Sequence, residues 1–592
     1  IDGKLEEEAW SSGALLSGFT QYDPTEGIPA TQRTEIRVLI TDDAILFGVR
    51  AFDDEVGGVR ATLSKRDGFG RSDDYVRFVL DTFDDQRRAF VFQVKPLGVQ
   101  GDGLWVGSGR RSIDWNPDFF WESAGRVVSD GYTVELKIPL KSLRFPEADI
   151  QDWGLQVVRK IQRNGFEESW APMTGETANR LAQSGRLRGL EGLRPGRFLE
   201  INPVVTGTRQ GSWDTAQESF GHSAATGDFG LNIAYGITSN LTLDATYNPD
   251  FSQVEADAGQ IVVNERFALY FPEKRSFFLE GTDVFSMPRQ LVYTRSIGNP
   301  VGAAKLSGKV GSFNVAYIGA VDEVSSGGEN PVVNLFRVKR DVGRSSTVGM
   351  VYTDRSVFGE SFNRVVGADA RLVLAQRYTL ELMASGSADG GNGLDTDWGS
   401  LFVANFSRSS RNFSLSASFE DVSEDFRARS GFIRRVGVSQ LRGRTGYTWR
   451  GEAGAFLESW GPSLEVQGYW NRDEFWAGSG AEESEIQLNL RFSLRGNVGG
   501  SVSLSRDSYA FGADDYGSLF VGGREGEAPT PFAPDQGVFQ GLYSFSARSW
   551  ISRWEKARLS FGASLGDTPI FTSGVPADVA ERRSGDVSLT LY

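Results

Sequence analysis

The sequence predicts an all-β protein: an N-terminal antiparallel β-sandwich followed by a transmembrane antiparallel β-barrel of roughly 16–20 strands. Three observations support this fold class. Segments in which apolar and polar residues alternate recur almost to the C-terminus, and no apolar run reaches the roughly 18–20 residues that a membrane-spanning helix needs. Glycine, at 71 of 592 residues, and aromatic residues, at 12%, suit tight turns and the aromatic girdles of a barrel.

Residues 1–190 form the predicted sandwich. The segment 44–49 is almost continuously apolar, as a strand covered on both faces would be. The Gly- and Pro-containing stretch 185–198 marks the expected boundary with the second domain. Short strands at regular spacing are typical of an antiparallel sandwich. We expect them at 34–40, 44–51, 75–80, 89–95, 122–128, 132–138 and 154–159.

Residues 191–592 form the predicted barrel. Side chains of a strand point to opposite faces in turn, so an alternating segment has one apolar and one polar face. A transmembrane barrel turns the apolar face to lipid and the polar face to its lumen, and it has short periplasmic turns and long external loops. An even number of strands places both chain ends, and therefore the sandwich, in the periplasm. The alternation is clear at 225–247, 413–420, 486–494 and 557–565, and a long loop is expected at 507–536.

The segment 248–281 interrupts the alternation. It is too long for a turn and too charged for lipid, and a short helix is expected to stop before Pro272, because the residue before proline disfavours the helical conformation. We expect the segment to plug the lumen or to pack beneath it, its charges paired with inward-facing residues such as Arg491 and Arg558. An ordinary long loop is the alternative. The candidate lumen or plug residues are Asp250, Glu255, Asp257, Glu273, Lys274, Arg275 and Glu280.

Composition argues against several classes of function. A single histidine, His222, disfavours His-ligated metal sites and His-based triads, and a net charge of −15 disfavours nucleic-acid binding, which needs a basic face. The absence of cysteine fits a chain that crosses an oxidising periplasm without disulfides. No basic and apolar leader precedes Ile1, so we expect a mature or trimmed chain.

Two groups of motifs give the chain a family resemblance. In the first domain they are IDGKLEEEAW at 1–10, SDDY at 72–75 with LDT at 80–82, and DGYTVELKIP at 130–139. In the second domain they are NPDFSQVEAD at 248–257 and PEKRSFFLEG at 272–281. With these motifs the chain resembles uncharacterised bacterial outer-membrane proteins that join a carbohydrate-binding-module family 9-like sandwich to a C-terminal barrel of unknown function. The resemblance implies a bacterial outer-membrane location and a glycan ligand, and no catalytic residues.

Three tryptophans of the sandwich are candidates for sugar binding. Sugars are recognised by flat aromatic faces with polar groups beside them. Trp105, Trp115 and Trp121 lie in a loop-rich stretch that also holds several Asp and Asn residues. Loops carry a disproportionate share of binding residues. Packing in the core is the alternative role for these rings.

A calcium site is the candidate cofactor site of the sandwich. Calcium needs several oxygen ligands that converge, and Asp81, Asp84 and Asp85 offer three carboxylates at short spacing. Family 9 modules, which the first domain resembles, are known for structural calcium. A solvated acidic turn is the alternative, because Asp favours turns through local hydrogen bonds alone.

These features support three hypotheses of function. The first is an outer-membrane barrel with a glycan-binding periplasmic sandwich, acting as a gated pore or an uptake component, with lipid, glycan and loop-bound proteins as partners. The second is a plugged barrel that serves as a scaffold or binds partners. The third, a carbohydrate-active hydrolase, needs two carboxylates across a cleft. Among 77 acidic residues no pair stands out, so we expect no enzyme.

Overall fold

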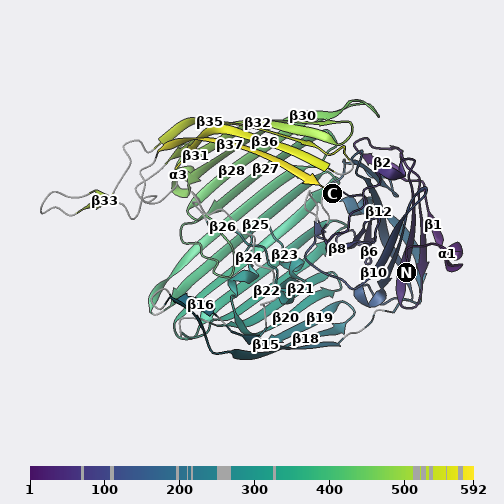
Figure 1. Ribbon diagram of the computed structural model, residues 1–592. Coiled ribbons are helices and arrows are strands. Elements are labelled where there is room, and N and C mark those ends of the chain that lie inside the picture. Colours follow the sequence, from purple (N-terminus) through teal and green to yellow (C-terminus); the bar gives the residue numbers. More distant parts are fainter. Residues whose placement is uncertain are drawn as a thin grey trace.

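A computed structural model of the protein (Figure 1) describes residues 1–592 except 69–72, 107–112, 195, 197–198, 210, 215–217, 250–267, 280, 324–327, 392, 511–519, 522–528, 532–537, 555–556, 571–577 and 592. Strands dominate, which confirms the predicted all-β class. The helices are short: α1 (Ala9–Ser12), α2 (Ser276–Leu279), α3 (Arg472–Ala477) and the 3-10 turns η1 (Val56–Gly58), η2 (Leu140–Ser142), η3 (Arg180–Gln183), η4 (Thr282–Phe285) and η5 (Thr294–Ser296). Within the described ranges, none of the helices has the length and apolar character to cross a membrane.

Two antiparallel sheets pack face to face to form the sandwich. The first has the order β1 (Ala14–Leu16), β4 (Thr34–Ile40), β5 (Ala44–Phe52), β11 (Gly131–Pro139), β10 (Glu122–Val128). The second has the order β3 (Ile28–Pro29), β2 (Thr20–Asp23), β13 (Phe166–Ser169), β12 (Ile150–Ile161), β6 (Tyr75–Asp81), β7 (Ala89–Val94), β8 (Gln100–Trp105), β9 (Ile113–Asp114), with β14 (Gly185–Glu191) also beside β12. All seven strands expected from the sequence are present. Their inner faces bury one core that includes Phe47, Phe78, Phe92, Tyr132 and Trp153.

The central strand β5 is covered on both faces, as its apolar sequence predicts. On its outer face, a Cβ atom at Gly48 would lie 3.0 Å from the ring of Trp10. The N-terminal motif is held there by the buried carboxylate of Glu135. This group accepts hydrogen bonds from the Trp10 indole N–H (3.1 Å) and from the backbone N–H groups of Asp2 and Gly3 (2.7 and 2.8 Å). The motif at 1–10 therefore closes one side of the sandwich.

The second unit is one large, strongly curled antiparallel sheet (Figure 1). Among the described residues it has nineteen strands, of which β29 continues β28 along the same neighbour, β30. Counting β28 and β29 as one gives eighteen strands, within the predicted range. Two hairpins, β16 (Gly211–Asp214) with β17 (Ser219–His222) and β33 (Phe520–Val521) with β34 (Thr530–Pro531), lie outside it. In spatial order the strands are β15 (Leu199–Thr208), β18 (Thr226–Thr238), β19 (Leu241–Tyr247), β20 (Pro300–Val310), β21 (Phe313–Asp322), β22 (Val332–Val342), β23 (Ser346–Val357), β24 (Ser361–Leu374), β25 (Tyr378–Gly391), β26 (Leu394–Arg408), β27 (Phe413–Val422), β28 (Val438–Tyr447), β29 (Trp449–Arg450), β30 (Leu457–Asn471), β31 (Glu483–Leu494), β32 (Val498–Ala510), β35 (Val538–Ile551), β36 (Ala557–Pro569) and β37 (Val579–Leu591).

The outer face of the large sheet is apolar and exposed, in agreement with the alternation in the sequence. Leu488 and Leu415 are 51% and 37% exposed on this face. Their neighbours Asn489 and Ser416 point inward, and the Asn489 amide donates a hydrogen bond to the Ser503 hydroxyl (2.9 Å) across the inner face. A soluble protein would bury such an apolar surface, whereas lipid covers it without cost.

The two edge strands of the large sheet, β15 and β37, are not hydrogen-bonded to each other among the described residues, so the structure shows a curled sheet with free edges. Unpaired backbone N–H and C=O groups are costly in a membrane, and closed barrels avoid them. Both strands carry apolar outward residues, such as Ile201 (55% exposed) and Leu589 (59% exposed). We therefore expect β15 and β37 to pair in the membrane.

Disulfide cross-linking tests this closure in a chain that has no native cysteine. Ile201→Cys combined in turn with Val587→Cys, Leu589→Cys or Leu591→Cys should give one pair that oxidises readily, and that pair reports the register. Leu559→Cys with Leu589→Cys is the positive control, because these residues are cross-strand partners in β36 and β37. Oxidation of the control alone would show that the edges stay apart.

A plug lies against the inner face of the large sheet. We define the plug as the described residues between 268 and 299, which include α2, η4 and η5. Phe278, Leu291 and Ile297 of the plug are fully buried against inward-facing residues of the sheet such as Ile318 and Leu335. Of the predicted segment 248–281, Phe278 is part of this packing, whereas 250–267 and 280 lie outside the described residues.

The two ends of the large sheet differ. Long connections, such as 423–437 between β27 and β28 and 472–482 between β30 and β31, lie at one end. Short turns lie at the other, and the sandwich rests on them (Figure 1). The Ala178 N–H donates to the carbonyl of Gln376 (2.7 Å) in the β24–β25 turn, and the Asn497 amide of the β31–β32 turn donates to the carbonyl of Gln162 (2.9 Å). The sandwich therefore covers the short-turn end.

Candidate functional site

The three candidate sugar-binding tryptophans lie in different environments. Trp105 and Trp121 are 8% and 4% exposed and pack in the sandwich, Trp121 edge-on against Phe92. Their buried faces are not available to a sugar, and they occupy the core position that was the alternative. Trp115 is half-buried, with the Arg77 guanidinium over its ring at 5.7 Å. Of the three rings, only Trp115 reaches a cavity large enough for a sugar.

That cavity lies between the sandwich and the short-turn end of the large sheet. We call it the capped cavity; it has a volume of about 770 Å³. The sandwich contributes Tyr75, Arg77, Gln93, Trp115, Lys160 and Glu167, and the sheet contributes Arg450, Glu458, Arg491, Trp550 and Arg558. Four aromatic rings, Tyr75, Trp115, Phe492 and Trp550, and many hydrogen-bonding side chains thus line one space, as in sites that bind sugars.

A partly buried charge network forms the sandwich wall of the capped cavity. Glu167 accepts a hydrogen bond from the Tyr22 hydroxyl and pairs with Lys160 at 3.5 Å. Burial would raise the pKa of Glu167, but Lys160 and Arg77 outweigh it and lower that pKa to about 2. Burial raises the pKa of Tyr75, which therefore stays a neutral hydroxyl. The wall is a fixed array of donors and acceptors at neutral pH.

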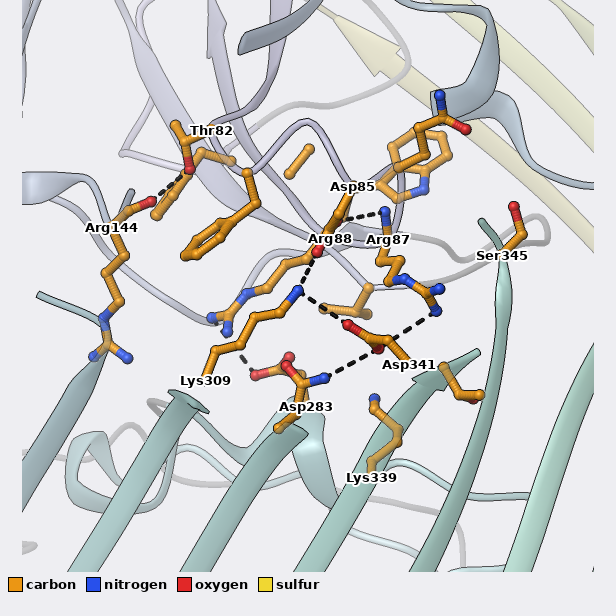
Figure 2. Close-up of a pocket in the computed structure, with 18 of the residues that line it drawn as sticks. Thr82, Asp85, Arg87, Arg88, Arg144, Asp283, Lys309, Lys339, Asp341 and Ser345 are labelled. Atoms are coloured by element: carbon orange, nitrogen blue, oxygen red, sulfur yellow. Dashed lines mark hydrogen bonds and ion pairs between the residues drawn. The ribbon is translucent and has the colours of Figure 1, made fainter. Parts of the chain in front are cut away.

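A second charge cluster joins the sandwich to the sheet and to the plug, around a small cavity of about 130 Å³ (Figure 2). Lys309 of β20 pairs with Asp85 of the sandwich and with Asp341 of β22 at 3.0 Å. Arg87 of the sandwich lies 3.4 Å from Asp341. Arg88 pairs with Asp283 of the plug at 3.6 Å. We call these six residues the latch, because they connect all three parts of the molecule.

The latch also uses backbone groups of the sheet. The Arg87 guanidinium donates to the carbonyls of Gly343 (2.6 Å) and Ser346 (2.7 Å), which flank the β22–β23 turn. The Asn179 amide donates to the hydroxyl of Ser345 (2.8 Å) in the same turn. The ion-pairing side chains of the latch are mostly shielded from water, so salt screens them less than it screens surface pairs.

The three candidate calcium ligands do not converge. Asp81 is buried and accepts hydrogen bonds from the backbone N–H groups of Phe83 (3.2 Å) and Gln86 (2.7 Å), while burial raises its pKa to about 7. Asp84 pairs with Arg186 (3.0 Å), and Asp85 pairs with Lys309 of the latch. Two of the three carboxylates already hold a cation from the chain, so this arrangement does not fit a calcium site.

The candidate plug residues that the structure describes pair mainly within the plug. Arg275 binds the carboxylate of Glu273 (2.7 Å) and donates to the carbonyls of Thr294 (2.8 Å) and Ile297 (2.7 Å). Arg491 and Arg558, named as expected partners, instead line the capped cavity, and Glu273 pairs with Arg275. Lys274 is half-buried beside them. Asp250, Glu255, Asp257 and Glu280 lie outside the described residues.

Sequence reasoning missed the latch and the sheet side of the capped cavity. Both sites are assembled from turns that are far apart in the chain, such as 82–88 and 341–346. The one local signal was the turn Asp84-Asp85-Gln86-Arg87-Arg88, in which both signs of charge follow each other at the end of a strand. Without the partners that the fold brings to them, Asp84 and Asp85 of this turn suggest a metal site.

The fold and the sites together define a class of protein. It is an all-β protein whose sandwich covers one end of a curled sheet, and this sheet has an apolar outer face and holds a plug against its inner face. Residues 199–311 match a family model described as a domain of unknown function, DUF5916. This match begins at the first strand of the sheet and includes the plug. No curated protein matches the sequence.

Several solved structures show a distant likeness. A candidate carbohydrate-binding protein from Bacteroides uniformis is 14% identical, with 30% of this chain and 87% of that chain covered and a TM-score of 0.25. OccK5 (OpdH) from Pseudomonas aeruginosa is 9% identical, with 88% and 97% covered and a TM-score of 0.26. The outer membrane protein opdK from Pseudomonas aeruginosa is 10% identical, with 74% and 93% covered and a TM-score of 0.26. Likeness at this level assigns no function.

Proposed function

We propose that this protein is a bacterial outer-membrane barrel whose periplasmic sandwich binds glycan at the capped cavity, as part of an uptake pore that is closed at rest. The apolar, exposed outer face of the sheet supports the membrane location. The position of the sandwich on the short-turn end supports its periplasmic side, since barrels of this kind have short periplasmic turns. The observation that carries the glycan proposal is Trp115, a half-buried ring on a polar cavity of about 770 Å³.

Truncation of Trp115 tests the glycan site. Trp115→Ala should weaken the binding of the full-length protein to its best oligosaccharide about tenfold, which corresponds to about 1.4 kcal/mol, because the stacking face is lost. Calorimetry against a panel of plant and bacterial oligosaccharides provides the wild-type ligand and the comparison. Phe120→Ala is the matched control: Phe120 is 62% exposed on the same sandwich but does not line the cavity.

Three outcomes of this experiment are informative. Equal affinity in Trp115→Ala and wild type would place the sugar elsewhere. No binding by wild type across the panel would contradict the glycan proposal itself. Release of new reducing ends during the incubation would instead identify a hydrolase.

A permanently plugged scaffold is the second candidate function. The dense apolar packing between plug and sheet favours it, since Phe278, Leu291 and Ile297 are fully buried. Conductance of the purified full-length protein in planar bilayers separates the two candidates. Stable openings in the presence of oligosaccharide support the gated pore, whereas silence under all conditions supports the scaffold.

A further inference from the structure

A second cavity lies between the sandwich and the plug. This plug cavity has a volume of about 480 Å³, within the range of about 300–1,000 Å³ typical of small-molecule sites. One wall is formed by the segment of the sandwich that contains Asp114 and Asn116, and the other by plug residues that include Tyr270, Gln290 and Tyr293. The plug cavity is separate from the capped cavity but shares this sandwich segment with it.

Two rings of the plug, Tyr270 and Tyr293, line this cavity, and Phe432 of the β27–β28 connection packs against both of them. The rings of Tyr270, Tyr293 and Phe432 lie 5.3–5.4 Å apart, centroid to centroid, in every pairing. Tyr270 is 37% exposed. This cluster of three rings therefore leaves part of its aromatic surface exposed in the plug cavity, although complete burial of the rings would be more favourable in free energy.

Backbone hydrogen bonds hold these rings in place. The Phe432 N–H donates to the carbonyl of Gln290 (2.8 Å), and the Tyr293 N–H donates to the carbonyl of Ser430 (2.7 Å). The Tyr293 hydroxyl donates to the carbonyl of Phe271 (2.8 Å). The connection between β27 and β28 is thereby tied to the plug. A surface fixed in this way loses little conformational freedom when a ligand stacks on it.

The polar groups of the plug cavity indicate the charge of its ligand. Carboxylates line it at Asp114, Glu273 and Asp283, and amides line it at Asn116 and Gln290. No Lys or Arg is among its described lining residues. Arg275 pairs with Glu273 and Arg88 pairs with Asp283, which offsets part of this negative charge. Because the described lining offers no cation to an anionic ligand, the cavity suits a neutral sugar better, whose hydroxyl groups can donate to the carboxylates and pair with the amides.

We infer that the plug cavity is a second sugar subsite, in which a neutral pyranose stacks on Tyr270 and is fixed by Gln290 and Asn116. This inference rests on the proposed glycan-binding function. Asp114 and Asn116 line the plug cavity, while Trp115, between them, lines the capped cavity. One oligosaccharide can therefore contact both subsites across a single segment of the sandwich.

Ring removal and ring retention at Tyr270 test the inference. Calorimetry with full-length protein in detergent would use a neutral hexasaccharide, maltohexaose or xylohexaose, and the anionic hexagalacturonate. Tyr270→Ala should weaken binding of the bound neutral hexasaccharide by about tenfold, while Tyr270→Phe, which keeps the ring, should stay within about threefold of wild type. Tyr317→Ala is the matched control, because Tyr317 is 38% exposed on the outer face of the sheet. Heat-modifiable migration of each variant checks that the barrel is assembled.

The outcomes separate this inference from the proposed function. Binding that is lost in Trp115→Ala but unchanged in Tyr270→Ala would overturn the second subsite and leave the first intact. Tighter binding of hexagalacturonate than of either neutral hexasaccharide would overturn the assignment of a neutral ligand. Absence of wild-type binding to all three probes would contradict the glycan function as a whole, and the second subsite with it.

Discussion

Replacement of Lys309 by glutamate is expected to free the sandwich from the large sheet and to make the protein conduct. Lys309 is the cation between Asp85 of the sandwich and Asp341 of the sheet, and these three side chains are only 19%, 22% and 11% exposed. Removal of one partner from a fully buried pair costs about 3–5 kcal/mol. We expect a smaller loss of stability here, because Lys309 is only partly shielded from water. Charge reversal adds the repulsion of a third carboxylate.

Two measurements follow the Lys309→Glu variant. Planar-bilayer recordings should show openings that wild type lacks, and limited proteolysis of the purified protein should release the sandwich earlier. Lys4→Glu is the control, since it makes the same change of charge on an exposed side chain away from the latch. Adding Asp85→Lys to the variant should restore the closed form, because the new cation would face both carboxylates. Wild-type conductance and proteolysis in Lys309→Glu would show that the latch does not hold the sandwich.

The latch also connects the sandwich to the plug, so we expect a movement of the sandwich to affect the plug. Arg87 and Arg88 are neighbours in one turn; Arg87 binds Asp341 of the sheet and Arg88 binds Asp283 of the plug. A ligand that displaces the sandwich from the short turns of the sheet would weaken both of these ion pairs. The latch therefore couples the sandwich to both the sheet and the plug, a coupling that the proposed gated pore would need and a passive scaffold would not.

The strands were predictable because their patterns are local. Alternation at 486–494 placed Leu488 outside and Asn489 inside, and the apolar run 44–49 identified a strand covered on both faces. Long-range pairing is not written in such patterns. The partner of Asp85 is Lys309, more than two hundred residues away, so the local sequence of the acidic turn suggests a metal site instead of an ion pair. Burial of Trp105 and Trp121 likewise depends on which strands meet them.

The inward-facing residues of the sheet strands indicate where the plug packs. Inward positions of the middle strands, such as Ile318, Leu335 and Val403, are apolar and fully buried, although a wet lumen would favour polar residues there. The later strands have polar inward residues, such as Ser503 and Ser505. Strands that are apolar on both faces therefore mark where the plug lies, and this contrast could have located it before the structure.

The second prediction with a large expected effect concerns the difference between the lipid-facing and the inward-facing side of the sheet. Leu488→Arg should impair assembly, because an arginine on the lipid face costs about 2–4 kcal/mol near the bilayer midplane. Asn489→Arg, one residue along β31, should assemble normally, since Asn489 faces the polar inner side and the plug core does not cover it. Leu415→Arg and Ser416→Arg form a second matched pair on β27. The measurement is the fraction of heat-modifiable protein recovered in the outer membrane.

Each possible result of these four variants has one structural meaning. Damage confined to Leu488→Arg and Leu415→Arg requires lipid on the outer face, because the inner and outer members of each pair are neighbours in the same strand and share its backbone hydrogen bonds. Equal damage in all four would mean that both faces are buried against protein, which contradicts a membrane barrel. Tolerance of all four would mean that the outer face meets water, and the wide apolar surface would then have to be covered by another protein.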